Sequence, residues 1–300
     1  MMDPISPDLL EEVCSWIQKN TALWFPRESR PILGEKLKAA AAEFGFAGAG
    51  QLARVMVSAG LSVEQLECLV GHLTVAETYF WREPRVFEEL RDHVFPALLN
   101  RRDAQGKRLR IWSAGCASGE EPYSLAIALS QVLPDFQDWQ ITILATDINS
   151  RMLKRARRGI FRDWSFRNAP PKFRARYFQA LPDNHWEIHS RFKEVVTFAY
   201  LNLAEDAFPN PVNNTNAMDV VFCRNVLMYF APEHIRIIME RFGRVLLPDG
   251  WLVVSSSELS LPCSSVFSPV NFPGGNRAAH DRQDRDRRVS APRQHSRQPD

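Results

Sequence analysis

Apolar residues in the first quarter of the chain recur at helical spacing, and no alternating run there predicts a strand. In the segment SPDLLEEVCSWIQKN, Ser6 suits a helix N-cap, Pro7 suits the first helical position and acids occupy the first turn. The segments ILGEKLKAAAAEFG and SVEQLECLVGHL predict two further helices. We therefore predict a small helical domain over residues 1–75, joined by a linker over residues 76–108 to the rest of the chain.

The pattern changes near Leu109, where short apolar runs rich in β-branched residues begin. Five such runs are LRIWSAG, QITILATDI, EVVTFAYLNL, DVVFCRNV and WLVVSSS. Helical spacing lies between most of them, at residues 121–132, 150–158 and 232–246. Strands that alternate with helices predict an α/β domain, here over residues 109–270, with a mostly parallel sheet covered on both faces.

Two segments depart from this alternation. Residues 161–193 contain the break NAPP and do not fit a single crossover helix, so they predict an insertion with a helical piece and a short β-hairpin centred on PDNH. Residues 276–300 consist mainly of Arg, Asp, Gln, Pro and Ser, with almost nothing apolar. Because such a composition cannot bury enough surface to fold, we predict a disordered tail or linker there.

Composition narrows the class of protein only a little. The 300 residues are 45% hydrophobic and 24% charged with a net charge of +2, which is ordinary for a soluble globular protein. No apolar run approaches the ~20 residues that span a bilayer, and the acidic N-terminus, broken by Pro4 and Pro7, is not typical of a signal peptide. Five cysteines without a CxxC pair indicate reduced thiols. We expect a cytoplasmic protein with no direct membrane insertion.

The charge is unevenly distributed along the chain. Between Arg151 and Arg176 there are ten Lys and Arg residues against one acid, Asp163. A solvated helix face and a docking surface for an acidic partner both explain this stretch, and the sequence leaves the two open.

Candidate chemistry lies where the predicted strands end, because ligands of open parallel sheets bind outside the carboxyl ends of the strands. The first strand ends in SAGCASG, where Gly115 and Gly119 permit a tight turn and a close approach to a ligand. This loop lacks the GxGxxG and GK[ST] patterns of phosphate sites. Glu120 and Glu121 follow directly and would repel a pyrophosphate. The pair favours a ligand that carries positive charge, while Glu120 could instead serve the helix N-terminus.

The second strand ends in ATDI, which places Asp147 where an acid can accept hydrogen bonds from ribose hydroxyls. An alternative is that Asp147 caps the helix that starts near Ser150. A glycine turn, a ribose acid and no phosphate loop together indicate a nucleoside without phosphates. S-adenosylmethionine fits this description, since it joins adenosine to a cationic sulfonium and an amino-acid end.

Four motifs resemble those of a known family. The segments TVAETYFWREP, WSAGCASGEEPYSLAIAL, ATDINSRMLKRARRGIF and FCRNVLMYF are similar, in order and spacing, to the CheR-type chemotaxis receptor methyltransferases, and the resemblance covers about residues 13–267. It implies a small helical domain, an active-site segment over residues 76–108 and a Rossmann-like S-adenosylmethionine-dependent methyltransferase domain with an inserted β-subdomain. It also implies transfer of a methyl group from S-adenosylmethionine to receptor glutamates, giving methyl esters and S-adenosylhomocysteine.

The resemblance implies roles for nine residues. Arg82 and Tyr229 would orient the substrate carboxylate, although Arg82 could be an ion-pair partner of Glu83 or Glu77, and Tyr229 could pack against the helix after Pro232. The cofactor contacts that it implies are Thr78, Arg82, Glu121, Asp147, Asn202, Leu203, Arg224 and Asn225. Many family members carry Asn where this chain has Ala76, so a side-chain contact there is absent or replaced.

The implied partner is the acidic cytoplasmic helical domain of a methyl-accepting signalling receptor. Residues 161–243 contain no glycine before Gly243, so we expect no capture of a receptor C-terminal peptide. A longer parent protein that continues into helical repeats, a weakly catalytic binding module and a methyltransferase for another protein substrate stay alternatives. A nucleic-acid substrate is disfavoured, because CRNV stands where amino-methyltransferases carry their Pro-Pro-aromatic motif. We also expect no metal, since the segment HWEIH lacks the HExxH spacing and a nearby third ligand.

Overall fold

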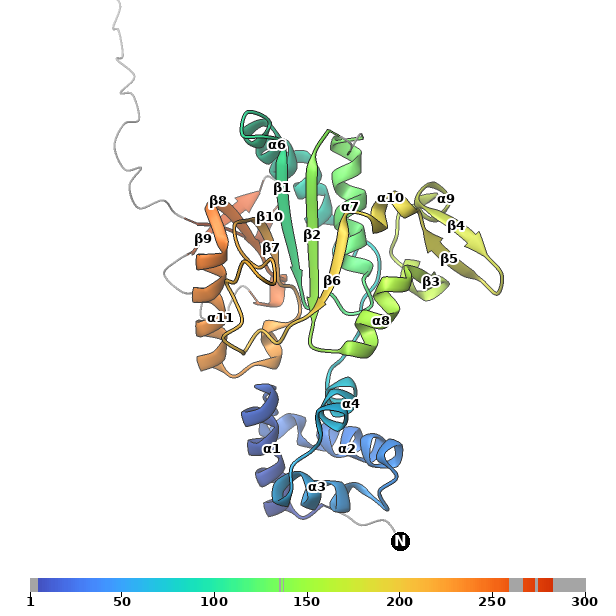
Figure 1. The fold of residues 1–300 in the computed structure, drawn as a ribbon, viewed down its shortest axis with the longest axis vertical. Helices are drawn as coiled ribbons and strands as arrows, with labels where there is room; N and C mark the ends of the chain where they lie inside the picture. Colours follow the sequence, from blue (N-terminus) through green and yellow to red (C-terminus); the bar gives the residue numbers. More distant parts are fainter. Residues whose placement is uncertain (1–4, 135, 137, 259–266, 273–274, 283–300) are drawn as a thin grey trace, which may run out of the picture.

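The N-terminal region is helical in the computed structural model, which describes residues 5–134, 136, 138–258, 267–272 and 275–282. Its helices are α1 (Pro7–Thr21), α2 (Arg30–Phe44), α3 (Ala49–Ser58) and α4 (Val63–Leu73), with a 3-10 turn, η1, at Arg27–Ser29 (Figure 1). The predicted start of α1 is confirmed, because the Ser6 side chain accepts a hydrogen bond from the Leu9 amide. These helices bury their own core, which includes Ile17, Leu37 and Met56.

A seven-stranded sheet forms the centre of the molecule, in the order β6-β2-β1-β7-β8-β10-β9. Its strands are β1 (Arg108–Ala114), β2 (Gln140–Asp147), β6 (Val196–Tyr200), β7 (Met218–Phe222), β8 (Leu246–Val253), β9 (Phe267–Phe272) and β10 (Gly275–Arg282). The five predicted strands pair in parallel, and β10 joins β8 and β9 in an antiparallel arrangement. The predicted α/β class is therefore confirmed.

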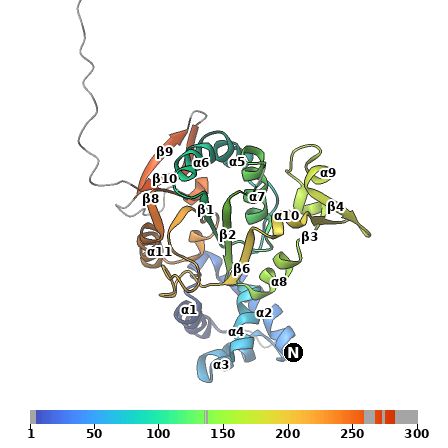
Figure 2. The ribbon, with the colours of Figure 1, turned by 45° about the horizontal axis from the view of Figure 1, so that its top comes forward.

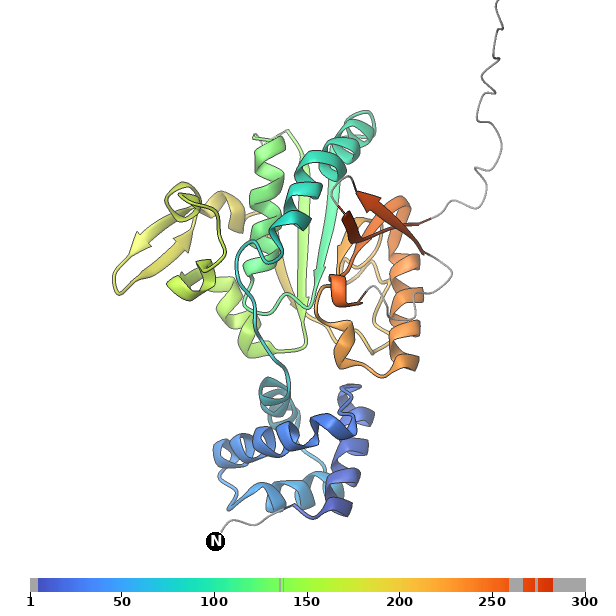
Figure 3. The same cartoon turned by 180° about the vertical axis from the view of Figure 1, so that it is seen from behind.

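Helices cover both faces of this sheet, and alternate residues of a strand enter different cores. Ile111 packs into the cluster under α5 (Pro84–Glu89), α6 (Phe95–Asp103) and α7 (Glu120–Val132), whereas Trp112 packs into the cluster under α11 (Pro232–Val245). A π-helical turn, η2 (Leu90–Val94), joins α5 to α6. Seen from behind, α5 and α6 cross in front of the strands (Figure 3). Burial on both faces explains why β1 is mostly apolar and is buried from Leu109 to Ala114.

The inserted segment forms a small antiparallel sheet beside the edge strand β6 (Figure 2). Its strands are β3 (Ile160–Arg162), β4 (Phe178–Leu181) and β5 (His185–Ile188), in the order β3-β5-β4, and they are accompanied by η3 (Asp163–Phe166), α9 (Phe173–Tyr177) and α10 (Ser190–Lys193). The hairpin predicted at PDNH is β4–β5. Phe80 packs its ring at the centre of this subdomain, so the segment before α5 anchors the insertion.

The prediction of disorder from residue 276 is wrong for residues 276–282, which belong to β10. Pairing with β8 and β9 gives this segment a backbone hydrogen-bond ladder, and that ladder does not depend on an apolar composition. Residues 283–300 lie outside the described residues. None of the helices among the described residues combines the length and the apolar character that a membrane span requires.

Candidate active site

One cavity lies at the carboxyl ends of β1, β2 and β7, between the sheet and the end of the N-terminal helices. Leu23 and Thr74 contribute from the helical region, and the chain after Thr74 runs along the wall. The space encloses about 940 Å³, open solvent included. All nine predicted site residues line it, namely Thr78, Arg82, Glu121, Asp147, Asn202, Leu203, Arg224, Asn225 and Tyr229. Ala76, where the contact made by the family's Asn was expected to be absent or replaced, also lies in the wall.

The loop after β1 makes the tight turn that its glycines predicted. Gly115 has φ +90° and Gly119 has φ +97°, both in the left-handed region. A Cβ atom at Gly115 would lie 2.3 Å from the Cγ2 atom of Val226, so this loop passes directly against the loop after β7. The two glycines therefore allow backbone atoms, in place of side chains, to line the cavity between the ends of β1 and β7.

Asp147 closes the second strand and faces the cavity with a partly buried carboxylate. Its Oδ2 accepts a hydrogen bond from the Ala117 amide and its Oδ1 accepts one from the Asn149 amide, each at 2.8 Å. Burial raises the pKa of Asp147 above its ordinary value, and these amides oppose the shift. The alternative of a helix cap is wrong, because Asn149 caps α8 (Ser150–Arg158) through its own side chain.

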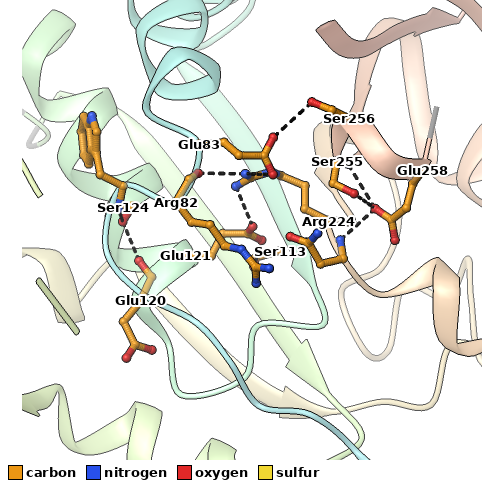
Figure 4. Close-up of polar contacts among 12 residues, drawn as sticks. Arg82, Glu83, Ser113, Glu120, Glu121, Ser124, Arg224, Ser255, Ser256 and Glu258 are labelled. Carbon is orange, nitrogen blue, oxygen red and sulfur yellow. Dashed lines mark hydrogen bonds and ion pairs between the residues drawn. The ribbon is translucent and has the colours of Figure 1, made fainter. Parts of the chain in front are cut away.

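Glu121 belongs to a buried ionic cluster centred on Arg224 (Figure 4). The Arg224 guanidinium lies 3.1 Å from the Glu83 carboxylate and 3.3 Å from the Glu121 carboxylate, and it donates to the Arg82 carbonyl at 2.8 Å. Ser113 donates to the other oxygen of Glu121 at 2.8 Å. With the Arg224 side chain only 1% exposed, one cation fixes two acids and the active-site segment at once.

The charge of Glu121 is thus partly compensated inside the protein. Burial raises the pKa of Glu121, and the neighbouring Arg224 opposes that shift. The Nε atom of Arg224 and the Oδ1 atom of Asn225 are both buried without a hydrogen-bond partner among the described residues. Because unpaired buried polar atoms are costly, these atoms indicate a wall built for a polar ligand.

Glu120, the other half of the acidic pair, faces away from this cluster. Its buried carboxylate accepts hydrogen bonds from Ser118 at 2.7 Å and from Ser165 at 2.8 Å. Burial raises the pKa of Glu120. Since Ser165 belongs to η3, Glu120 joins the start of α7 to the inserted subdomain. The two adjacent glutamates therefore have separate tasks, one in the cavity and one in the packing behind it.

Arg82 lies in the cavity wall between two residues in the left-handed region, Trp81 at φ +61° and Glu83 at φ +60°. Its Nη1 donates to the Glu77 carbonyl at 2.8 Å. The ion-pair alternative for Arg82 is wrong, because the Glu83 carboxylate pairs with Arg224 and the Glu77 carboxylate pairs with Arg167. Strained backbone on both sides fixes the direction in which Arg82 leaves the chain.

Tyr229 ends the 3-10 turn η4 (Leu227–Tyr229) and is half buried against the core of the N-terminal helices, instead of against α11. Its carbonyl accepts a hydrogen bond from the Trp24 amide at 2.9 Å. Burial raises the pKa of Tyr229, and the positive charge of Arg82 opposes the shift. The phenol therefore keeps its proton at neutral pH and remains a hydrogen-bond donor.

The remaining predicted contacts, Thr78, Asn202 and Leu203, also line the cavity. The Asn202 side chain accepts from the Ala204 amide at 3.0 Å and is buried beside Leu203. Thr78 lies on the segment that follows α4. The structure brings these residues together in one cavity, and their individual contacts with a ligand stay predictions.

Glu258 was not predicted. This fully buried acid lies in η5 (Ser256–Glu258), and it accepts hydrogen bonds from the amides of Asn225, Val226 and Leu227, each at 2.8 Å. Ser255 donates to it as well. A weaker form of the signal that singled out Asp147 could have found it, because Asp147 ends β2 and Glu258 follows the end of β8 by five residues. Glu258 holds the loop that carries Asn225, which has φ +58°.

Comparison with known proteins gives this cavity a family. The SAM binding domain of the CheR methyltransferases matches residues 76–273. Chemotaxis protein methyltransferase 2 of Vibrio cholerae is 36% identical over 211 residues, which cover 70% of this chain and 72% of that protein. The chemotaxis protein methyltransferase of Borreliella burgdorferi is 28% identical over 256 residues, covering 85% and 89%. A probable chemotaxis protein methyltransferase of Rhizobium etli is 35% identical over 209 residues, covering 68% and 75%. The resemblance found in the four motifs is confirmed, and the chain belongs to the CheR methyltransferase family.

Proposed function

We propose that this protein transfers the methyl group of S-adenosylmethionine to glutamate side chains of methyl-accepting chemotaxis-type receptors. The products are glutamyl methyl esters and S-adenosylhomocysteine. The observation that carries the proposal is the convergence of Arg82, Glu121, Asp147 and Tyr229 on one cavity at the carboxyl edge of the sheet. Membership of the CheR methyltransferase family supports the same reaction.

The cavity fits an adenosine-linked sulfonium. Asp147 keeps acceptor capacity for ribose hydroxyls, since each carboxylate oxygen has two lone pairs and the amides of Ala117 and Asn149 bind different oxygens. Glu121 supplies partly compensated negative charge for the cationic amino-acid end, and the unpaired Oδ1 of Asn225 offers a further acceptor. The bound cofactor supplies an electrophilic methyl group on a positively charged sulfur.

The chain itself needs no general base for this reaction. A free glutamate has a pKa of about 4.3 and is already ionised at neutral pH. Arg82 and Tyr229 would instead hold the substrate carboxylate in line with the methyl group, one by its charge and the other by its phenolic proton. Their grip has to be moderate, because the carboxylate loses its charge in the transition state and tight binding of the ionised form would slow the reaction.

A basic face of α8 supports docking of an acidic receptor helix. Arg155 and Arg158 are exposed and lie three residues apart on this helix, whereas Arg157 donates a hydrogen bond to the Phe198 carbonyl. Replacing Arg155 and Arg158 with Glu should weaken methylation of a receptor at least about tenfold, if each lost attraction contributes about 0.7 kcal/mol, and leave cofactor affinity unchanged. Unchanged receptor methylation would remove α8 from the docking surface.

The direct test is incubation with cofactor carrying a labelled methyl group and the cytoplasmic domain of a methyl-accepting receptor. Label that enters the receptor and leaves as methanol under mild base identifies a glutamyl methyl ester. Cofactor binding with no transfer to any receptor domain would favour the weakly catalytic binding module. Label on another protein would favour the different protein substrate. A chain that does not bind the cofactor would refute the proposal.

A further inference from the structure

A group of metal-binding side chains lies away from the cavity, at the contact between the N-terminal helices and α8. Glu43 comes from the last turn of α2, and Cys68 and His72 come from α4. One ligand atom from each lies within 4.8 Å of the other two. Cys68 and His72 are four residues apart, so they project from the same face of α4, while Glu43 reaches them across the α2–α4 contact.

The polar atoms of this group already converge. The Nε2 atom of His72 lies 2.7 Å from the Oε2 atom of Glu43. The side chains of His72 and Glu43 are 21% and 41% exposed, so solvent reaches the group while the helices hold its members in place. Thiolate, imidazole and carboxylate are the three ligand types that zinc sites use.

A cation already occupies the centre of this group. The guanidinium of Arg151, from the first turn of α8, forms an ion pair with Glu43, and its Nη2 lies 2.9 Å from the Sγ atom of Cys68. The Arg151 side chain is 46% exposed and long, so it can leave without disturbing a core. The group of Glu43, Cys68 and His72 therefore attracts positive charge, and another cation can replace the Arg151 guanidinium there.

We propose that Glu43, Cys68 and His72 bind a zinc ion in exchange for the Arg151 guanidinium. Cys68 binds as a thiolate and gives up its proton to solvent, His72 binds as neutral imidazole through Nε2, and one water completes a tetrahedral set. The ion takes over the bridge between α2 and α4. Arg151 is released from the helical region, which loosens the contact between that region and α8. This inference is independent of the proposed reaction.

The test uses the full chain and Co²⁺ as a spectroscopic probe, with Zn²⁺ as competitor. The wild type should bind one equivalent of Co²⁺ with a thiolate-to-metal charge-transfer band that Zn²⁺ abolishes. Cys68→Ser should lose the band and weaken Zn²⁺ binding at least about tenfold, the lower limit for loss of even a supporting group at a metal site. The matched control is Cys14→Ser, because Cys14 is another partly buried thiol of the same helical region and should bind like the wild type.

Arg151→Ala separates a zinc site from adventitious binding. Removing the competing cation should tighten Zn²⁺ binding roughly two- to fivefold, as expected for loss of one exposed ion pair. Glu43→Gln is a second ligand variant at an exposed position, and it should weaken binding while circular dichroism shows an unchanged fold. Equal affinities in the wild type and Cys68→Ser, weaker binding in Arg151→Ala, or no metal uptake by either the wild type or Arg151→Ala would each overturn the proposal.

Discussion

Glu258 offers the sharpest test of how the cavity is held open. Its two carboxylate oxygens together accept the amides of Asn225, Val226, Leu227 and Ser255. Ser255 also donates its hydroxyl to Glu258, and Figure 4 shows these two residues side by side. The acid is 1% exposed, so water cannot replace these bonds. Glu258→Gln keeps the shape of the side chain but turns one accepting oxygen into an NH₂ group, which faces two backbone donors whichever way the amide rotates.

The cost follows from those two donors. A buried donor that loses its acceptor costs about 1–3 kcal/mol, so two of them should lower the free energy of unfolding by about 3 kcal/mol after partial relaxation. The same change lets the loop at Asn225 and Tyr229 shift. We expect weaker cofactor binding and slower methyl transfer in molecules that remain folded.

Urea unfolding of the wild type and Glu258→Gln measures the first effect, and calorimetric titration with S-adenosylhomocysteine measures the second. Glu240→Gln is the matched control, because Glu240 is exposed and forms an i,i+4 ion pair with the exposed Arg236. That change should cost less than about 0.5 kcal/mol. If Glu258→Gln also stayed within that limit and kept its cofactor affinity, Glu258 would not position the loop.

Three further predictions concern the cavity. If Arg82 and Tyr229 act mainly on the alignment of the substrate, Arg82→Ala should lower kcat/KM about 100-fold and Tyr229→Phe about tenfold. Formation of the base-labile ester measures both rates. A loss confined to the KM for the cofactor would contradict this role. Cofactor affinity should fall as pH falls through the raised pKa of Asp147, because the ionised form accepts the ribose hydroxyls, and Asp147→Asn should flatten this dependence in a titration series. The stability of the free protein depends on pH in the opposite direction to cofactor affinity. Because folding raises the pKa of this carboxyl, the folded state binds the proton more tightly than the unfolded state. Its contribution to the free energy of unfolding therefore increases as pH falls toward the unfolded pKa. Gly115→Ala should lower the free energy of unfolding by about 2 kcal/mol or more, because its Cβ clashes with Val226 and its φ is +90°. Adding Val226→Ala should restore only the part of this loss that the clash causes. Urea unfolding measures both variants.

The sequence predicted the sheet well because its signals are local. Each predicted strand was a mostly apolar run, which burial on both faces of the sheet favours, although β1 also buries Arg110. Strand β10, which lies between β8 and β9, escaped prediction because its order depends on pairing with these two strands, which no local composition records. Helix α3 was missed for a simpler reason, since its start at Ala49 has Gly48 at the N-cap position and no side-chain cap.

The site shows the same division between local and distant causes. Asp147 was predicted from its place at a strand end, and its backbone contacts are indeed local. The pairing of Glu121 with Arg224 was not predicted, because the two residues are 103 positions apart in the sequence. A sequence can indicate that an acid belongs to a site, but the charge it finally presents depends on which distant cation folds against it.

The segment that follows α4 explains how three parts of the molecule act as one site. Phe80 is the centre of the inserted subdomain, Arg82 enters the cavity and Glu83 pairs with Arg224 beneath it. The N-terminal region adds the Trp24 bond to the Tyr229 carbonyl. The two residues expected to orient the substrate are held by different parts of the chain: Arg82 lies on the segment after α4, whereas Tyr229 is bonded to Trp24 of the N-terminal region. A displacement of the helical region would therefore move Tyr229 relative to Arg82. The helical region therefore contributes to the candidate active site as well as to any docking surface.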